Sequence, residues 1–371
     1  MSVINYEKLY FLKCVQNLLN SKYSNSITGE LVELIENNNK FFEFNEEYIQ
    51  IFNRKSYEEI SEKEKTLMKG LNKKQKNELI LSELKKTVSN NISKLIKAPK
   101  SSLQKRFDVI SQTFNLNKEE DKILNFIFRY ENSKPIEDLW DKFSELITES
   151  KNCRFEKNPL FISVITGIDK NKVKKVLSSN SELYKSSILV NNGSSKCIEI
   201  NEKISECICS NIKNKNDIQK TILGCCRKTE LSLNDFSYLK KEKEIILNLL
   251  ASTLSEKTKG VNVLLYGPPG TGKTEFSAAM SQELQCKIYS VGEADEGREP
   301  DRKTRLSSLN LAQSVLRNDE KTIILFDEAE DVLEGSFSFF GISVKNQNVS
   351  KIYCNRLIEE NTTRSPRGSV D

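Results

Sequence analysis

The stretch VNVLLYGPPGTGKT, residues 261–274, decides the fold of the last third of this 371-residue chain. Its first part, Val261–Tyr266, is a compact apolar run that predicts a buried parallel strand. Its second part, Gly267–Thr274, has the pattern G-x-x-x-x-G-K-T, and Glu275–Leu284 after it reads as a helix. A strand, a glycine-rich loop and a helix in this order are the context in which such a loop binds phosphate.

The residue types of this loop fit phosphate chemistry. Glycines let backbone N–H groups turn inward around phosphate oxygens at the N-terminus of a helix. Lys273 supplies a positive charge for the β- and γ-phosphates, and the Thr274 hydroxyl is a ligand for Mg²⁺. The predicted nucleotide-binding residues are Gly267, Pro268, Pro269, Gly270, Thr271, Gly272, Lys273 and Thr274.

A second motif reads TIILFDE. Its first five residues, Thr322–Phe326, predict another buried strand, so Asp327 and Glu328 come at the carboxyl end of that strand, beside the loop. Asp327 is predicted to share the Mg²⁺ with Thr274, and Glu328 to polarise the attacking water as general base. The predicted catalytic residues are therefore Lys273 and Glu328.

Between the two motifs the sequence predicts a further strand, Cys286–Val291, and a helix, Leu306–Leu316. Arg305 and Arg317 flank this helix, and we expect both side chains to be solvated. Nine of the 14 glycines lie from Gly260 onward, which marks this part of the chain as the one that needs tight backbone turns.

Composition excludes several kinds of site. The chain has no histidine, so it holds neither a Ser-His-Asp or Cys-His catalytic site nor a histidine-ligated metal. Its nine cysteines form no C-x-x-C pair, and we interpret them as reduced thiols that fill small spaces in a cytoplasmic protein. No apolar run reaches the roughly 18–20 residues of a membrane span, so no membrane partner is predicted. The net charge of +5 permits contact with nucleic acid without requiring it.

The part of the chain before the loop is predicted to be mostly helical. Over residues 1–150 glycine and proline are scarce and apolar residues recur every three or four positions, which predicts a helical domain. Trp140, the only tryptophan, is expected to pack in its core. Residues 230–259 read as a connector, in which a short extended piece, LSLNDFSYL, precedes an amphipathic helix, Lys240–Leu254.

Residues 151–229 have the outline of a winged helix, with two helices and then a hairpin closed by an Asn-Gly turn. The predicted elements are the helices Phe161–Thr166 and Asn171–Ser178 and the strands Ser187–Val190 and Lys196–Ile200. The second helix carries Lys172, Lys174 and Lys175, and it would be the recognition helix if the module bound DNA. A winged helix that only packs or contacts protein is the alternative.

The loop GPPGTGKT together with IILFDE resembles the AAA+ ATPases, and within them the AAA family. Over residues 231–360 the chain is similar to bacterial AAA ATPases that have a long helical N-terminal region. This resemblance implies ATP and Mg²⁺ as cofactors, a homo-oligomer such as a hexamer, and remodelling of a protein or nucleic-acid client. It also implies that Asp235 and Phe236 approach the adenine. A DEAD-box helicase is disfavoured, because Glu330 stands where that motif ends in aspartate.

The chain departs from the AAA+ pattern after the second motif. The family continues with a strand that carries a polar sensor residue, an arginine finger and a helical lid. Here a helix, Asn346–Glu360, is followed by an atypical tail, residues 362–371. We therefore expect a C-terminally truncated ATPase core over residues 260–361, in which the strand before the loop lacks both of its ladder neighbours.

The predicted fold is a mostly α N-terminal region with a winged-helix-like segment, followed by a partial α/β P-loop domain. Three functions remain open. The chain is an AAA-family ATPase that remodels a client, or a truncated and catalytically inactive remnant that binds through its helical and winged-helix parts, or a winged-helix DNA-binding regulator with a vestigial ATPase part. Because the region of the sensor and the arginine finger is missing, nucleotide binding and hydrolysis are separate predictions.

Overall fold

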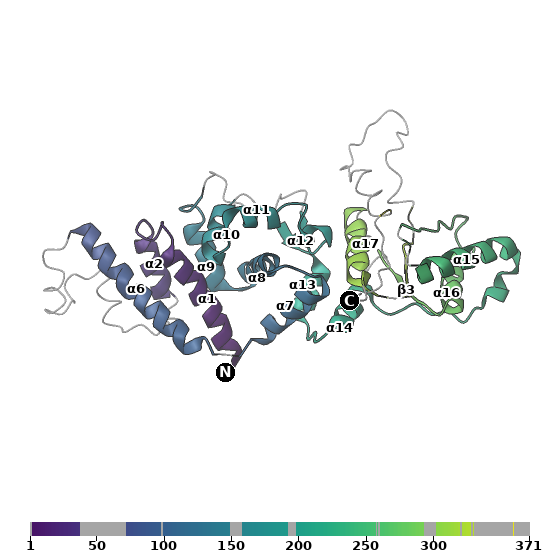
Figure 1. Cartoon of the computed structure of the whole chain (residues 1–371), viewed down its shortest axis with the longest axis horizontal. Helices are drawn as coiled ribbons and strands as arrows, with labels where there is room; N and C mark the ends of the chain where they lie inside the picture. The colour runs from purple at the N-terminus through teal and green to yellow at the C-terminus, as the bar shows by residue number, and fades with distance from the viewer. Residues whose placement is uncertain are drawn as a thin grey trace, which may run out of the picture. The chain divides into compact units, whose positions relative to one another are not determined.

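The computed structural model describes residues 2–37, 72–97, 99–148, 158–191, 198–256, 258, 260–292, 302–319, 321–327, 329 and 359. The predicted helix Asn346–Glu360, apart from Glu359, and the tail at residues 362–371 lie outside these ranges. The chain divides into two compact units (Figure 1). Unit 1 comprises Met1–Leu183 and Asn191–Ile200, and unit 2 comprises Tyr184–Val190 and Asn201–Asp371.

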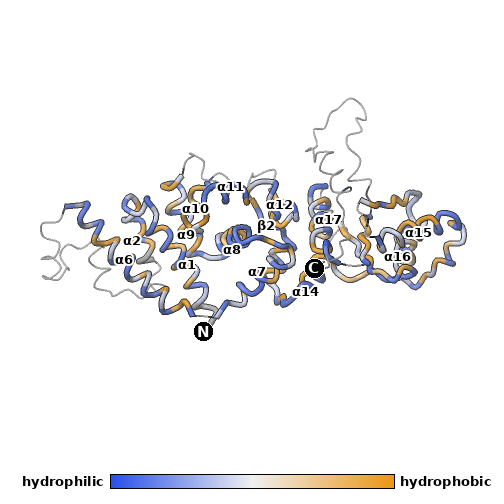
Figure 2. Tube along the Cα trace, viewed as in Figure 1, coloured by the Kyte–Doolittle hydropathy of each residue, from blue (hydrophilic) through white to orange (hydrophobic). Residues whose placement is uncertain are grey.

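Unit 1 is built from helices, as the apolar periodicity predicts. They are α1 (Ser2–Asn20), α2 (Thr28–Asn37), α6 (Lys73–Leu95), α7 (Ser102–Thr113), α8 (Lys118–Asn132), α9 (Lys134–Phe143), α10 (Pro159–Thr166) and α11 (Lys170–Val176). α1 packs against α6 and α10, and α8 packs against α9 and α11. Figure 2 shows apolar and polar residues alternating along α6, where Leu84 and Val88 lie on the buried side.

Side-chain caps set where several of these helices begin and end. At the start of α8 the Asn117 side chain accepts a hydrogen bond from the Glu120 backbone N–H at 2.9 Å, and the Glu120 carboxylate accepts one from the Asn117 N–H at 3.0 Å. The same capping box starts α6 at Asn72. α10 ends at Gly167, whose φ of 67° is the left-handed conformation that glycine adopts without strain. Local sequence therefore determines these boundaries.

The core of unit 1 is apolar and also encloses the charged side chain of Arg129. Trp140 is 6% exposed and packs edge-on against Phe161 with ring centres 5.3 Å apart, as predicted. Arg129 on α8 is 2% exposed, and its guanidinium group donates to the Glu7 carboxylate at 2.7 Å and lies 4.1 Å from the ring centre of Tyr10. The carboxylate and the ring together compensate the guanidinium group for its lost hydration.

The segment predicted to be a winged helix contains the expected elements in the expected order. After α10 and α11 come α12 (Glu182–Lys185), β1 (Leu189–Asn191) and β2 (Ile198–Ile200), and the two strands form a two-stranded sheet. The Asn-Gly turn at residues 192–193 lies outside the described residues. Lys172 pairs with Glu119 at 2.6 Å, and both Lys172 and Lys174 are exposed. Neither a winged helix nor DNA binding follows from these observations, and both stay predictions.

Unit 2 contains a parallel pair of strands with helices packed against it (Figure 1). From Asn201 onward its elements are α13 (Glu202–Cys209), α14 (Lys215–Leu223), the 3₁₀ helix η2 (Leu233–Leu239), α15 (Lys240–Glu256), α16 (Lys273–Glu283), β3 (Lys287–Ser290), α17 (Arg302–Leu316) and β4 (Thr322–Leu325). β3 pairs with β4 from Lys287 opposite Thr322 to Ser290 opposite Leu325. α16 contacts both strands, and α17 contacts β4 and α14. Within the described residues, the strands and helices predicted beside the two motifs are thus confirmed, with one exception, and β4 is only partly buried.

The exception is the apolar run before the loop, for which the prediction of a buried strand is wrong. Residues 261–266 belong to neither sheet, and the side chains of Leu264 and Tyr266 are 69% and 90% exposed. A strand is buried when neighbouring strands flank it, and in the described part of the chain β3 and β4 pair with each other and not with this run. Leu265 alternates to the other side and packs against apolar residues of η2 and α16.

The connector also differs from its prediction. The piece LSLNDFSYL was expected to be extended, but most of it forms η2. The reason is local: the Ser232 backbone N–H and hydroxyl both donate to the Asp235 carboxylate, at 2.7 and 2.9 Å, and this capping contact starts a helical turn. The amphipathic helix predicted after it is present as α15.

Candidate nucleotide-binding site

The glycine-rich loop turns sharply at three of its glycines. Gly267, Gly270 and Gly272 have φ angles of 150°, 77° and 80°, which residues with a Cβ rarely adopt. Gly272 is also the N-cap of α16, so Lys273 and Thr274 form the start of that helix. The loop therefore ends at a helix N-terminus, where N–H groups and the helix dipole favour an anion.

The Lys273 side chain lies back over the loop. Its Nζ donates to the backbone carbonyl oxygens of Gly267 and Pro268, at 2.9 and 3.0 Å. The Thr271 hydroxyl donates to the same Pro268 carbonyl at 2.9 Å, and Pro269 is exposed. The ammonium group is thus held beside the loop by neutral acceptors, which a charged phosphate oxygen would outcompete.

The structure brings the loop and the second motif together. The Thr274 hydroxyl donates to the Asp327 carboxylate at 2.9 Å, although 53 residues separate them in the sequence. The contact arises because α16 packs against β3 and β4, and Asp327 follows the end of β4. A hydroxyl and a carboxylate are hard oxygen ligands, so this pair fits Mg²⁺. Glu328, the predicted general base, lies outside the described residues.

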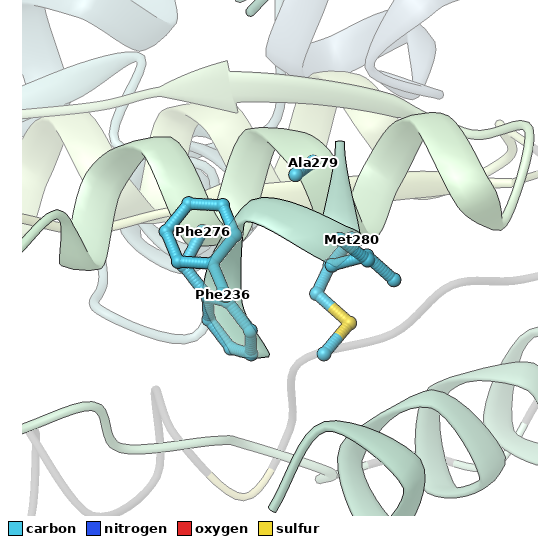
Figure 3. Close-up of a cluster of buried hydrophobic side chains, with 5 residues drawn as sticks. Phe236, Phe276, Ala279 and Met280 are labelled. Carbon is cyan, nitrogen blue, oxygen red and sulfur yellow. The ribbon is translucent and has the colours of Figure 1, made fainter. Parts of the chain in front are cut away.

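An apolar cluster packs η2 of the connector against the first turns of α16, and Figure 3 shows most of it. This η2–α16 cluster consists of Leu233, Phe236, Phe276, Ala279 and Met280. The rings of Phe236 and Phe276 meet edge to face with centres 5.2 Å apart. A Cβ built on Gly272 would lie 3.5 Å from the Phe236 ring, so the ring also packs against the loop.

Asp235 and Phe236, which the resemblance places near the adenine, have other contacts here. The backbone N–H of Ser232 lowers the pKa of the Asp235 carboxyl group, and Phe236 is 4% exposed inside the η2–α16 cluster. Tyr238, which the sequence analysis did not single out, reaches the loop instead: its hydroxyl donates to the Thr271 carbonyl at 3.2 Å. No motif of the sequence marks Tyr238 for this contact. A contact of Asp235 or Phe236 with adenine stays a prediction.

Arg305 on α17 is buried at the same edge of the sheet, which corrects the expectation that it is solvated. It is 6% exposed, and its Nε donates to the Gly292 carbonyl at 3.1 Å. One of its terminal nitrogens donates to the Asp327 carbonyl. Its guanidinium carbon lies 5.1 Å from the ring centre of Phe326.

Helical spacing explains the burial of Arg305. It lies seven residues before Ala312 and eleven before Leu316, which are both buried, so all three share one face of α17. That periodicity was the sequence signal for its position. Arg317, also expected to be solvated, is half-buried.

Burial makes three of the described thiols weakly acidic, and the described ranges hold no cluster suited to a further metal ion. Burial raises the pKa of the Cys14 thiol to about 12 and those of Cys207 and Cys286 to about 11, so these thiols stay protonated near neutral pH. Within those ranges no group of three or more Cys, Asp or Glu side chains is arranged to hold a metal ion. Nor does any helix there have the length and apolar character needed to cross a membrane.

Comparison with known proteins assigns a family to this region. Residues 263–361 match the model of the ATPase family associated with various cellular activities (AAA). The chain is 32% identical over 82 residues to the Replication factor C large subunit of Nanoarchaeum equitans, and 26% identical over 99 residues to that of Sulfurisphaera tokodaii. These matches cover 22% and 27% of this chain, and 19% and 22% of those proteins.

A third relative comes from Arabidopsis thaliana. The chain is 33% identical over 75 residues to its probable inactive ATP-dependent zinc metalloprotease FTSHI 4, chloroplastic, which covers 18% of this chain and 9% of that protein. The chain thus spans at most 22% of the length of these curated relatives. No solved structure matches it. The glycine-rich loop, its contact with the second motif and the family match agree, and the chain carries a domain of the AAA family of ATPases.

Proposed function

We propose that this chain binds ATP with Mg²⁺ at Gly267–Thr274 and hydrolyses it. The observation that carries the proposal is the 2.9 Å hydrogen bond between Thr274 and Asp327, because it sets the loop motif against the strand motif. The AAA family match over residues 263–361 supports the same function.

Each site residue has a role in this proposal. The N–H groups of the loop bind phosphate oxygens, and Lys273 adds a charge-assisted hydrogen bond to them. Thr274 and Asp327 hold Mg²⁺, which when bound neutralises charge on the phosphate oxygens. Glu328 accepts a proton from the attacking water as general base.

We also propose that the chain works as one subunit of an oligomer that remodels a protein or nucleic-acid client. Two of its relatives are named as large subunits, which supports assembly, and the AAA resemblance favours a hexamer. The family match lies in unit 2, so the helical unit 1 is the part proposed to present the client.

The test compares the purified chain with Lys273→Ala and Glu328→Gln. Lys273→Ala is expected to lose at least about tenfold in ATP affinity, because it lacks the charge-assisted bond. Glu328→Gln is expected to bind ATP normally and to hydrolyse it at least about 100-fold more slowly, since it cannot accept a proton. Lys241→Ala, at an exposed lysine of α15, is the control and should match the unchanged chain. Equal hydrolysis rates in all four proteins would refute turnover at this site.

Nucleotide binding without hydrolysis is the second candidate. Its specific support is that residues 261–266 lie outside both sheets, which leaves the loop without the strand that the predicted fold placed before it. Such a protein would bind a fluorescent ATP analogue, lose that binding in Lys273→Ala, and release no phosphate. Its function would then be binding through the upstream helices.

A further inference from the structure

One guanidinium group contacts the carboxyl ends of both parallel strands of unit 2. Arg305 donates to the Gly292 carbonyl at 3.1 Å and to the Asp327 carbonyl. Gly292 lies two residues after the end of β3, and Asp327 lies two residues after the end of β4. Arg305 therefore ties together the two strand ends at the edge where Thr274 meets Asp327.

The residues around the guanidinium group are closely packed. Arg305 lies with its guanidinium carbon 5.1 Å from the ring centre of Phe326, the residue just before Asp327. Gly292 has a φ of 82°, and a Cβ built on it would come within 2.8 Å of the same ring. The Arg305 side chain, the Phe326 ring and the Gly292 backbone together restrict the conformation of the backbone that leads into Asp327.

The helix that carries Arg305 is anchored by other elements of the same unit. Asn310 on α17 donates to the Ser187 hydroxyl at 2.8 Å. Asp319, just beyond α17, accepts hydrogen bonds from Lys215 and Gln219 of α14. A helix held at several points along its length gives Arg305 a defined position, which a loop would not.

We propose that Arg305 is a positioning residue for the Mg²⁺ site, an inference that rests on the proposed function. By holding the Asp327 carbonyl, Arg305 sets the direction in which the Asp327 carboxylate meets the Thr274 hydroxyl. Arg305 acts through the backbone and does not touch the nucleotide. An arginine suits this task because its planar fork donates to two carbonyls in fixed directions, whereas a lysine ammonium group is a single point.

The test uses Arg305→Lys, which keeps the charge and removes the fork. Affinity for a fluorescent ATP analogue is measured by titration, once with Mg²⁺ and once with EDTA. We expect the affinity in EDTA to stay within about twofold of the unchanged chain, and the gain on adding Mg²⁺ to shrink by about tenfold or more, as for other residues that orient metal ligands. Arg317→Lys, the same change just beyond the end of α17, is the matched control and should keep the full gain.

Each outcome separates this inference from the proposed function. If the unchanged chain binds no nucleotide, the proposed function fails, and the inference fails with it. If the chain binds with a Mg²⁺-dependent gain and Arg305→Lys keeps that gain, or loses affinity equally with and without Mg²⁺, only the positioning role is overturned. Thermal melting checks folding, and Arg305→Gln, whose amide still donates to one carbonyl, replaces Arg305→Lys if the latter unfolds. If both variants unfolded, Arg305 would be required for folding, and this result would also overturn the proposal.

Discussion

At the scale of single residues, Gly272 shows how directly the shape of the loop depends on residue type. Its φ of 80° is left-handed, and that conformation costs an L-residue about 1–2 kcal/mol. The space beside it is sufficient, since a Cβ would lie 3.5 Å from the Phe236 ring, at ordinary contact distance. We therefore predict that Gly272→Ala lowers the free energy of unfolding by about 1–2 kcal/mol through backbone strain, measured by urea denaturation.

Gly29 on α2 provides the control for this prediction. It does not have a left-handed φ, and a Cβ there would meet no atom within 4 Å. Gly29→Ala should therefore raise the free energy of unfolding by about 0.5–1 kcal/mol, because alanine loses less backbone entropy in a helix. If the two variants shifted stability in the same direction, backbone conformation would not be the cause of the effect at Gly272.

The predicted site residues differ from the missed ones in how local their signal is. Thr274 and Asp327 were predicted to meet, because each belongs to a motif whose strand and helix context fixes where it lies. Arg305 was missed because it belongs to no motif, and its role depends on which carbonyls of distant strands come near it. A single-residue role of that kind becomes visible once the helix face and the sheet edge are both known.

At the scale of elements, helices were predictable and the strand before the loop was not. The apolar periodicity over residues 1–150 is a local signal that predicted helices there, and the structure adds the caps at Asn72 and Asn117 that set where α6 and α8 begin. A strand depends on a neighbour that the local sequence does not contain, so the apolar run at residues 261–266 reads as a strand and yet lies outside the sheets. The register of β3 against β4, with Lys287 opposite Thr322, likewise came from the structure and not from the sequence.

The contact between α1 and α8 leads to a prediction about stability. Arg129 is 2% exposed, and the Glu7 carboxylate accepts a hydrogen bond from its guanidinium group at 2.7 Å. Glu7→Ala would leave a buried charge with weaker partners, such as the Asn125 side chain at 2.7 Å. Because Glu7 is itself partly exposed, we expect a loss of about 3 kcal/mol in the free energy of unfolding, at the lower end for a broken buried pair.

The double variant Glu7→Ala/Arg129→Met tests the cause of that loss. It removes the charge together with its partner, so it should be more stable than Glu7→Ala alone. Urea denaturation of the two single variants and the double variant gives the coupling between the two positions. If the loss of stability in the double variant equalled the sum of the two single losses, the ion pair would not contribute to holding α1 against α8.

At the scale of the whole molecule, the chain consists of two compact units, and the AAA family match lies in one of them. Unit 1 contains the helices α1 to α11, and unit 2 contains the glycine-rich loop and the parallel strands. If each unit has its own core, a ligand of unit 2 should stabilise unit 2 without stabilising unit 1. The cysteines provide a reporter in each unit.

Cys14 lies buried in unit 1 and Cys286 half-buried in unit 2, and burial raises the pKa of both thiols, so both react slowly with iodoacetamide until their surroundings unfold. ATP with Mg²⁺ at about 100 times its dissociation constant should stabilise the unit that binds it by about 2.7 kcal/mol. We therefore predict that the urea concentration at which Cys286 becomes labelled rises with ATP and Mg²⁺, while that for Cys14 stays constant, as read by mass spectrometry after a short pulse of reagent. Lys273→Ala should abolish the shift at Cys286. An equal shift at both cysteines would mean that the two units unfold together. A shift at Cys14 alone would mean that the nucleotide stabilises unit 1 and not unit 2.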